Sequence, residues 1–407
     1  MKILFLVSSM RIPNPSWHLM KALIEDVLDS GIEIHALQYN PEGSTLPPFP
    51  ESIMSHSNFS YSEVPCKKVE KRKFAKRYIY SIFDAIKMKS LIKKNNDYDM
   101  IFMQSSISSF YNICFARRYA KKRPIIFNSQ DMFPGSAIAN GSMPHKWMQK
   151  IFYAMQKKAY KKTTAITAIS EDMKIKLIEQ GVPEDKISVI VNWYDDIAVK
   201  EVEWENNRFV KQYDLNKDKF YVQYAGTMGT NFNPEVILDT AQLLKNYSDI
   251  EFQMIGNGVR RDKFEKDAID RGLDNIKFYP LQTQDMVSDV YSACSVCLIP
   301  LKQGVIGNSV PSKAALLMAC RRVIINSVDA GSIYGEMFEK QKIGFSAGVE
   351  DYTKIADDIL KLYHNPELLN EYANRAKEYG FTHYSRKVNT QKYIKIFENF
   401  KDTQQND

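Results

Sequence analysis

Short apolar runs alternate with amphipathic stretches along almost the whole chain, and this alternation limits the fold more than any other feature. In the first half the apolar runs are residues 2–7, 33–38, 98–104, 124–128, 164–168 and 187–191. In the second half they are residues 220–226, 250–256, 276–280, 295–301 and 322–326. Runs of this length are typical of buried strands, and the stretches between them have helical periodicity. Strands separated by helices form parallel sheets covered on both faces, so the pattern predicts an α/β protein.

The length of the chain indicates two domains. A chain of 407 residues is too long for one ordinary domain and suits two. The polar, acidic segment 195–216 has no clear period and is interpreted as the interdomain linker. We therefore predict two Rossmann-like doubly wound domains, residues 1–200 and 201–380, that face each other across a cleft. Residues 381–407 are expected to form a C-terminal helix that crosses back to the first domain.

Several protein classes are disfavoured by what the sequence lacks. No apolar run approaches the roughly 20 residues of a membrane span, and the start of the chain has no signal-peptide pattern. These features predict a cytoplasmic protein, and the five cysteines suit that compartment. Cys294 and Cys297 form a C-x-x-C that is interpreted as part of a buried strand, and no metal-ligand spacing accompanies it. No G-x-G-x-x-G follows a strand, which argues against a dinucleotide-dependent dehydrogenase.

Positive charge is concentrated in the first half. Residues 67–94 hold 11 Lys and Arg against two acidic residues. Apolar side chains recur in the same segment at helical spacing, so it is predicted to be a basic amphipathic helix suited to an anionic membrane surface. The candidate membrane or acceptor contacts are Lys71, Arg72, Lys73, Phe74, Lys76, Arg77 and Tyr78. The alternative is a helix that packs on the core with a solvated basic back, and no nucleic-acid-binding motif is present.

The segment 309–313 is the strongest candidate for an anion site. It reads SVPSK and lies between the apolar strand SVCLIPL and an apolar helix. Ligands bind at such positions in open α/β sheets, because free amides at a helix start attract anions. Ser309 and Pro311 fix the loop, Ser312 is expected to cap the helix, and Lys313 adds a positive charge. The alternative for Lys313 is a solvated side chain.

Two glycine-bearing loops follow the first strands of the second half. One contains Gly226 and Thr227, and its glycine leaves room for a ligand beside the backbone. The other contains Gly256 and Gly258, followed by two cationic residues, Arg260 and Arg261, at the start of a helix. A cation at a helix N-terminus is unfavourable unless an anion compensates it, which favours binding of a diphosphate. The alternative for both loops is an ordinary tight turn.

Three further positions complete the candidate sites. Asp131 follows the strand 124–128, at the carboxyl end where it can reach a ligand, and is a candidate general base or hydroxyl-orienting carboxylate. The alternative for Asp131 is a turn or helix cap. Asn192 closes the first half and either binds the donor or stabilises a turn, and Leu281 follows the strand 276–280 as a further donor contact.

Together these motifs resemble the family-4 glycosyltransferases, which have the GT-B fold. The similarity rests on SQDMFPGSAIANG, VIVNWYD, YAGTMGTNFNPE, FQMIGNGVRRDKFE, SVPSKAALLMACRRVII and GFSAGVEDYTKIA, in this order. The branch that is most similar builds bacterial capsule, O-antigen and colanic-acid units, such as the L-fucosamine transferases. The resemblance covers most of the chain from about residue 127 to 351.

The resemblance implies a hexosyltransferase that retains anomeric configuration without a metal or other cofactor. It implies a nucleotide-sugar donor, such as a UDP-sugar, held by the second domain. The first domain would hold an undecaprenyl-diphosphate-linked saccharide as acceptor. Such an acceptor implies a peripheral enzyme on the inner face of the cell membrane, with no nucleic-acid partner.

The chain departs from the wider family at several positions. Asn308 and Leu316 stand where that family has two glutamates, Thr227 and Asn233 stand near its usual Arg and Lys, and Gln130 replaces a histidine. These departures leave two alternatives open. One is a non-catalytic GT-B subunit that activates a partner transferase, and the other is a nucleotide-sugar epimerase of the same fold.

Overall fold

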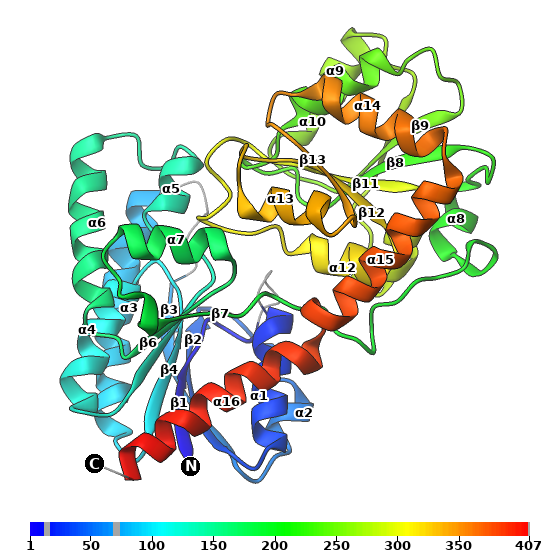
Figure 1. The fold of residues 1–407 in the computed structure, drawn as a ribbon. Helices are drawn as coiled ribbons and strands as arrows, with labels where there is room; N and C mark the ends of the chain where they lie inside the picture. Colours follow the sequence, from blue (N-terminus) through cyan, green and yellow to red (C-terminus); the bar gives the residue numbers. More distant parts are fainter. Residues whose placement is uncertain (12–16, 68–73, 406–407) are drawn as a thin grey trace. The chain divides into compact units, whose positions relative to one another are not determined.

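The structure is a computed structural model that describes residues 1–11, 17–67 and 74–405. The chain divides into two compact units (Figure 1). The first unit comprises Met1–Val191 together with Lys387–Asp407, and the second comprises Asn192–Arg386. The division between the units therefore falls earlier in the chain than residue 200, and the end of the chain belongs to the first unit.

A seven-stranded parallel sheet forms the centre of the first unit, in the order β3-β2-β1-β4-β5-β6-β7. Its strands are β1 (Lys2–Leu6), β2 (Glu33–Pro41), β3 (Phe59–Cys66), β4 (Met100–Gln104), β5 (Ile125–Ser129), β6 (Ala165–Ala168) and β7 (Ile187–Val189). The order reverses between β1 and β4, which is the switch point of a doubly wound sheet. The predicted α/β class is confirmed, and β3 is a strand that the sequence analysis did not include.

Helices cover both faces of this sheet. They are α1 (Trp17–Asp29), α2 (Glu51–Met54), α3 (Phe74–Lys94), α4 (Ser109–Ala120), α5 (Gly135–Ala139), α6 (Lys146–Tyr160), α7 (Glu171–Glu179), η1 (Glu184–Lys186) and α16 (Arg386–Gln405). In Figure 1, α3, α4 and α6 lie on one side of the sheet, and α1 and α16 lie on the other. Ser170 caps α7 as its sequence suggests, because its side chain accepts a hydrogen bond from the Met173 amide at 3.1 Å.

The last helix is part of the first unit's core. The ring of Phe397 lies 6.0 Å from that of Phe5 and 5.6 Å from that of Phe102. Tyr393 is fully buried, and its hydroxyl accepts a 2.6 Å hydrogen bond from the Asn128 side chain. These contacts join α16 to β1, β4 and β5, so the end of the chain stabilises the sheet that carries the first candidate site.

The second unit contains a six-stranded parallel sheet in the order β10-β9-β8-β11-β12-β13. Its strands are β8 (Phe220–Ala225), β9 (Ile250–Ile255), β10 (Ile276–Tyr279), β11 (Val296–Pro300), β12 (Val323–Ser327) and β13 (Gly344–Ala347). The other elements are η2 (Trp204–Asn206), α8 (Arg208–Tyr213), α9 (Pro234–Leu243), α10 (Arg261–Asp270), η3 (Gln284–Met286), α11 (Val287–Ser292), α12 (Lys313–Ala319), α13 (Ile333–Lys340), α14 (Tyr352–Tyr363) and α15 (Pro366–Tyr384).

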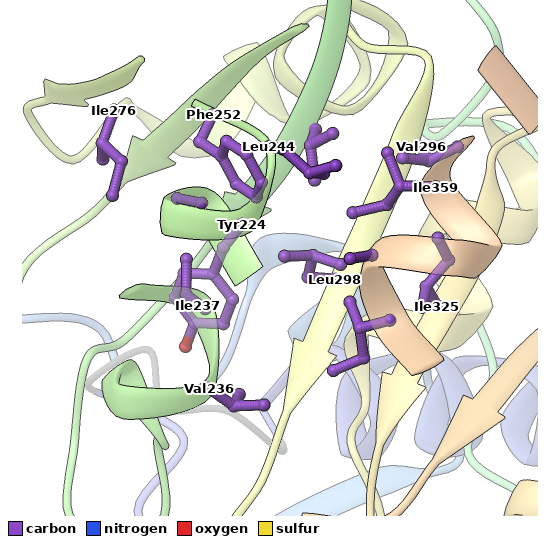
Figure 2. Packing of buried hydrophobic residues seen from close by; sticks show 14 of the residues in the cluster. Tyr224, Val236, Ile237, Leu244, Phe252, Ile276, Val296, Leu298, Ile325 and Ile359 are labelled. Carbon is purple, nitrogen blue, oxygen red and sulfur yellow. The ribbon is translucent and has the colours of Figure 1, made fainter. Parts of the chain in front are cut away.

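The core of the second unit lies between its sheet and two helices, α9 and α14 (Figure 2). Phe252 projects from β9 and Leu298 from β11, while Ile237 comes from α9 and Ile359 from α14. All four side chains are fully or almost fully buried. Each buried side chain of this size contributes about 1.5–3 kcal/mol to folding. The core therefore fixes the strand ends at which the second candidate site lies.

The segment 195–216 is a packed part of the second unit, so its interpretation as a linker is wrong. The Arg208 amide and guanidinium donate to the Asp289 carboxylate at 2.7 and 2.8 Å. The Glu201 carboxylate lies 3.1 Å from the Arg322 guanidinium. Polar residues without period suggest a loop, but here they are ordered by charged partners that lie far along the chain.

Candidate functional sites at the two strand ends

Two glycine loops pack backbone against backbone in the second unit, at the ends of β8 and β9. A Cβ on Gly256 would lie 2.0 Å from the Gly226 carbonyl oxygen, and one on Gly258 would lie 2.3 Å from that of Met228. The φ angles of Gly256 and Gly258 are +136° and +154°. Glycine is therefore required at both positions by close packing and by conformation. This pair of loops, residues 226–233 and 256–260, is called the glycine site below.

The amides of the three glycines already have partners within the protein. Gly226 donates to the Ile255 carbonyl at 2.9 Å, Gly256 to that of Tyr279 at 3.3 Å, and Gly258 to the Asn257 side chain at 2.7 Å. These three amides therefore donate within the protein, and the donor-binding role of the three glycines stays a prediction. Across the described ranges, the structure assigns no acceptor to the amides of Thr227 and Gly229, which follow in the same loop. The Thr227 carbonyl accepts from the Tyr224 hydroxyl at 2.7 Å.

The Lys313 side chain contacts the start of the first glycine loop. Its Nζ donates to the Ala225 carbonyl at 3.2 Å and lies 3.7 Å from the centre of the Tyr224 ring. A Cβ on Gly226 would come within 2.9 Å of the same nitrogen, so the lysine touches the loop directly. Burial lowers the pKa of Lys313 to about 7. An anion nearby would favour the charged form, so the site is suited to exchange a proton when an anion binds.

The loop that leads to Lys313 is held by Asp329. Its carboxylate accepts from the amides of Gly304 and Ile306 at 2.6 and 3.0 Å. The side chain of Asn308 donates to the Gly304 carbonyl at 2.8 Å, which tightens the same loop. Ser309 and Pro311 are half-buried here, and Ser312 is exposed. The expected capping by Ser312 is wrong, because its side chain makes no hydrogen bond to the start of α12.

The two arginines after Gly258 have different surroundings. Arg261 donates to the Tyr279 carbonyl at 2.6 Å and also to that of Gly256, so it holds strand ends together. Arg260 is half-buried, and its amide donates to the Met228 carbonyl at 3.1 Å. Partial burial and then the positive charge of Arg260 lower the pKa of Lys302. Lys302 follows β11, and its amide donates to the Asn231 carbonyl of the first glycine loop at 3.0 Å.

Two other predicted donor residues lie in the second unit. Leu281 is 66% exposed directly after β10, so an apolar group is available to solvent there. The side-chain oxygen of Asn192 is buried without a hydrogen-bond partner among the described residues. A buried unpaired amide oxygen costs about 1–3 kcal/mol, which makes Asn192 a position where a ligand or water would restore a hydrogen bond.

The first unit contains a polar pocket of about 220 Å³ at the ends of β4 and β5. Its polar lining residues are Arg77, Ser105, Ser106, Asp131, Ser136, Asn140 and Ser142. Ile107, Phe133 and Ala137 add the apolar part of the wall. Since one water occupies about 30 Å³ of liquid, this space suits a small polar group such as one sugar ring. It is called the Asp131 pocket below.

Asp131 has an altered proton affinity in this pocket. Asp131 is exposed to solvent at the pocket, but nearby protein atoms displace part of the water around its carboxyl group, and this desolvation raises the pKa of Asp131 to about 6. The Ser105 hydroxyl oxygen accepts from the amides of Gln130 and Asp131 at 3.0 and 3.3 Å, which orients the turn. A carboxylate with a pKa near neutrality is suited to take up a proton from a hydroxyl group.

The predicted basic helix corresponds to α3 and has more than one role. Lys71, Arg72 and Lys73 lie outside the described residues, as does the side chain of Phe74. Lys76 is exposed, whereas Arg77 lines the Asp131 pocket. Tyr78 packs against Phe133 and Phe152, at centroid distances of 6.1 and 4.9 Å. The aromatic cluster of Tyr78 therefore joins α3 to α6 and to the pocket.

An exposed apolar surface remains on these helices. On α3, Ile79, Phe83 and Ile86 are 53%, 56% and 49% exposed. On α6, Trp147 and Ile151 are 64% and 50% exposed. The inward side of α3 is apolar as well, since Ala85, Met88 and Ile92 are buried. Helix α3 thus has an inward apolar side that packs on the core and an outward apolar side that is exposed.

Two negative findings apply to the described ranges. Within residues 1–11, 17–67 and 74–405, no group of three or more His, Cys, Asp and Glu side chains is placed to hold a metal ion. No helix in those ranges combines the length and hydropathy of a membrane span. The thiols of Cys294 and Cys297 are buried and 3.3 Å apart, in the free form.

Comparison with known proteins agrees with this architecture. The family model described as Glycosyltransferase Family 4 matches residues 21–196, and the model described as Glycosyl transferases group 1 matches residues 205–379. The two matches follow one another and lie in the two halves of the chain. Each half is thus similar to a glycosyltransferase domain.

Two curated relatives and one solved structure illustrate the similarity. WbjE of Pseudomonas aeruginosa, named as a probable glycosyltransferase, is 25% identical over 60% of this chain and 62% of its own length. WcaI of Escherichia coli (strain K12), named for glycosyl transfer in colanic acid biosynthesis, is 27% identical over 43% of each chain. The chain spans less than two thirds of the length of either relative. Anabaena Alr3699/HepE, solved with UDP, matches the fold with a TM-score of 0.74 at 12% identity, covering 98% of this chain and 100% of its own.

Proposed function

Because the chain belongs to the family-4 glycosyltransferases and has their GT-B fold, we propose that it transfers a sugar in the synthesis of a bacterial surface polysaccharide. The donor is a nucleoside-diphosphate sugar held by the second unit. The acceptor is a saccharide held by the first unit. The observation that carries the proposal is the glycine site. Its loops are close-packed, and the Lys313 ammonium group contacts the end of β8 at Ala225 and Gly226.

The donor's diphosphate binds at the glycine site. Departure of that group builds negative charge on its oxygens, so fixed positive groups there lower the barrier. Lys313 and the amides of Thr227 and Gly229 supply such groups. Asn192, Leu281 and the loop from Ser309 to Ser312 complete the surroundings of the donor. A uridine nucleotide is favoured as the carrier, since the similar fold of Alr3699/HepE was solved with UDP.

The acceptor hydroxyl binds beside Asp131. The bond between the anomeric carbon and the phosphate oxygen breaks, and a bond from that carbon to the acceptor oxygen forms. The hydroxyl proton passes to Asp131 or to the departing phosphate. Asp131 must be ionised to take up the proton, and its pKa of about 6 allows this at neutral pH. Retention of anomeric configuration and independence from metal are expected from the family and belong to the proposal.

The saccharide acceptor is carried by an undecaprenyl diphosphate lipid, and α3 places the first unit on an anionic membrane. The exposed Ile79, Phe83 and Ile86 supply apolar contacts, and exposed lysines such as Lys76 and Lys87 supply charge. A basic amphipathic helix of this kind binds at the lipid headgroup boundary. Phe83→Ser should weaken binding to anionic vesicles, while Ile269→Ser, a 72% exposed control on α10, should not. Equal vesicle binding by both variants would exclude this role for α3.

A binding subunit without catalysis is the second candidate function. The observation in its favour concerns Asn308, which stands where the wider family has a glutamate. The Asn308 side chain donates a hydrogen bond to the Gly304 carbonyl. Such a subunit would bind a nucleotide sugar and activate a partner transferase. An epimerase of the same fold is less well supported, because it has no use for a lipid-facing helix.

Turnover separates these candidates. The purified protein is incubated with UDP-sugars and lipid-linked saccharides. Both the released UDP and the lengthened saccharide are measured. We expect one UDP for each sugar transferred. Lys313→Ala should lower turnover strongly with the fold retained, because Lys313 contacts the glycine loop from below. Wild-type turnover in Lys313→Ala would contradict the assigned role, and binding without turnover by the wild type would favour the subunit.

A further inference from the structure

We propose that an apolar groove in the first unit binds an alkyl or isoprenyl chain attached to the acceptor saccharide. The groove lies between the loops that follow β1 and β2 and has a volume of about 420 Å³. Its apolar lining consists of Met10, Trp17, Leu46, Phe49, Met54 and two prolines. The inference rests on the proposed function and gives a site to the apolar part of the acceptor. None of these residues was a candidate site residue in the sequence.

Polar side chains hold the two loops that form the apolar groove. Gln38 is fully buried in β2, and its side-chain oxygen accepts from the Met10 amide at 2.7 Å. Its side-chain nitrogen donates to the Pro48 carbonyl at 2.8 Å. The Trp17 indole donates to the Met10 carbonyl at 2.8 Å, which orients the ring. The groove is therefore formed before a ligand binds, as small-molecule sites of about 300–1,000 Å³ usually are.

The chemistry of the lining favours an uncharged ligand. Arg11 and Glu51 are the charged side chains of the described lining. The Arg11 guanidinium donates to the two carboxylate oxygens of Glu63 at 2.9 and 2.6 Å, so its charge is compensated within the protein. Glu51 is exposed at the start of α2. A diphosphate or a bare sugar would lose hydrogen bonds to water on entering this groove, whereas a hydrocarbon chain would not.

The rim of the apolar groove exposes apolar side chains to solvent. Leu46 and Met54 are 47% and 45% exposed, whereas Met10 and Phe49 are 3% and 1% exposed. The groove thus has a buried floor and an open rim. A chain that lies along it removes apolar surface of the ligand and of the rim from water, which is favourable.

The apolar groove adjoins the Asp131 pocket along one edge of the sheet. Strands β1 and β4 are neighbours, and the Ser8 amide donates to the Gln104 side chain at 3.2 Å. Met10, two residues after Ser8, lines the groove, and Ser105, directly after Gln104, lines the pocket. A ligand that occupies both has a sugar at one end and a hydrocarbon chain at the other. This continuity selects the chain of a lipid-linked acceptor as the occupant.

A series of alkyl β-glucosides tests the apolar groove. Methyl, butyl, hexyl and octyl glucoside, each below its critical micelle concentration, are titrated into the full chain and binding is measured by calorimetry. Each CH₂ that enters the groove should tighten binding by up to about fourfold. Leu46→Ser and Met54→Ser should flatten this dependence on chain length, and both positions are exposed enough for the fold to be retained. Ile269→Ser, a change at a 72% exposed position on α10, is the control and should keep the dependence.

The outcomes distinguish this inference from the proposed function. Binding that tightens with chain length in the wild type and in Ile269→Ser, but not in Leu46→Ser or Met54→Ser, supports the groove. A wild-type affinity that is independent of chain length overturns the groove, and turnover of lipid-linked saccharides would still leave the proposed function in place. Binding that depends on chain length, without turnover, supports the groove and contradicts the proposed function.

Two other occupants are recognised in the same experiment. Loss of the dependence on chain length in Phe83→Ser, which changes a 56% exposed side chain on α3, would place the chain on that helix and overturn the groove. A dimer of the wild type that dissociates in Leu46→Ser, measured by sedimentation, would assign the groove to a second copy of the chain and also overturn the inference.

Discussion

The glycine site of the second unit and the Asp131 pocket of the first unit lie at similar strand ends but are built differently. The glycine site is formed by main chain against main chain, with Gly256 and Gly258 in conformations that favour glycine. The Asp131 pocket is formed by side chains from three segments of the chain, residues 77, 105–107 and 131–142, and four of its seven polar lining residues are serines. The glycine site fixes the position of charged groups, whereas the Asp131 pocket has room for a small polar group. Substitutions that disturb the backbone should therefore impair the glycine site most. Substitutions that remove a single polar atom should impair the Asp131 pocket most.

Gly256→Ala should have the largest effect. A Cβ at this position would lie 2.0 Å from the Gly226 carbonyl oxygen, and the φ angle of +136° is unfavourable for alanine. The strain and the clash together should cost about 3–5 kcal/mol of unfolding free energy. Thermal unfolding and UDP binding of the variant measure this cost. Gly229→Ala is the matched control for thermal unfolding, because its nearest neighbour would be Thr227 Cγ2 at an ordinary 3.6 Å. Equal stability of the two variants would contradict the packing role of Gly256.

Asp131→Asn should have the next largest effect, and it should act mainly on turnover. The amide keeps the shape of the side chain but cannot accept the acceptor's proton. General base catalysis typically contributes 10²–10⁴-fold, so kcat should fall at least about 100-fold, with a smaller change in KM. Steady-state kinetics with saturating acceptor measures the two constants separately. Asp185→Asn, the same change at an exposed carboxylate outside the pocket, is the control. Retained kcat in Asp131→Asn would assign the proton to the leaving phosphate.

Ser105→Ala tests whether the pocket depends on single polar atoms. The Ser105 hydroxyl oxygen accepts from two successive amides, those of Gln130 and Asp131. Its removal leaves both donors without this partner, which should cost about 1–3 kcal/mol of unfolding free energy. Denaturant unfolding measures the loss, and kcat should fall as the turn that carries Asp131 loosens. Ser106→Ala serves as the control, since its hydroxyl pairs only with that of Ser108, at 3.2 Å. Identical losses in both variants would show that the turn does not depend on Ser105.

The smallest expected effect is a pH-dependent difference in stability between Asp131→Asn and the wild type. The folded protein raises the pKa of Asp131 to about 6, above the value of about 3.9 in an unfolded chain. Folding is therefore penalised when Asp131 is ionised, and the penalty disappears as the pH falls from about 6 to about 4. Above pH 6 the variant should be more stable by about 1 kcal/mol or less, since solvent reaches the side chain. Unfolding measured from pH 4 to pH 8 checks this sign. A variant that is less stable than the wild type at pH 7 would contradict it.

The same difference in construction explains what could be predicted from the sequence. The alternation of apolar runs gave both parallel sheets, because the period of buried strands is a local property. Gly226, Gly256 and Lys313 were recognised because they lie in short segments next to strands. The Asp131 pocket could not be derived in this way, since Arg77 and Ser142 reach it through tertiary folding. Asp131 was named as a candidate from its place after β5, and Arg77 was named as part of the basic segment, without a link between the two.

Other differences have similar physical causes. The segment 195–216 looked like a linker because its polar residues lack period, but Arg208 and Glu201 find charged partners far along the chain. The amides of Gly226 and Gly256 donate to the carbonyls of Ile255 and Tyr279, because the sheet continues its hydrogen bonds into the loops. Lys302, which follows β11, lies far from the glycine loops in sequence, and its amide joins them by donating to the Asn231 carbonyl.

Thermal stabilisation of the purified protein by nucleoside diphosphates tests the central claim most directly. A ligand that binds only the folded state raises the melting temperature, so UDP, GDP, ADP and dTDP are compared, each with and without EDTA. We expect one of these nucleotides, with UDP as the first candidate, to raise the melting temperature clearly. The shift should be unchanged by EDTA and should be lost in Gly256→Ala. No shift with any of the four nucleotides would contradict a donor site in the second unit.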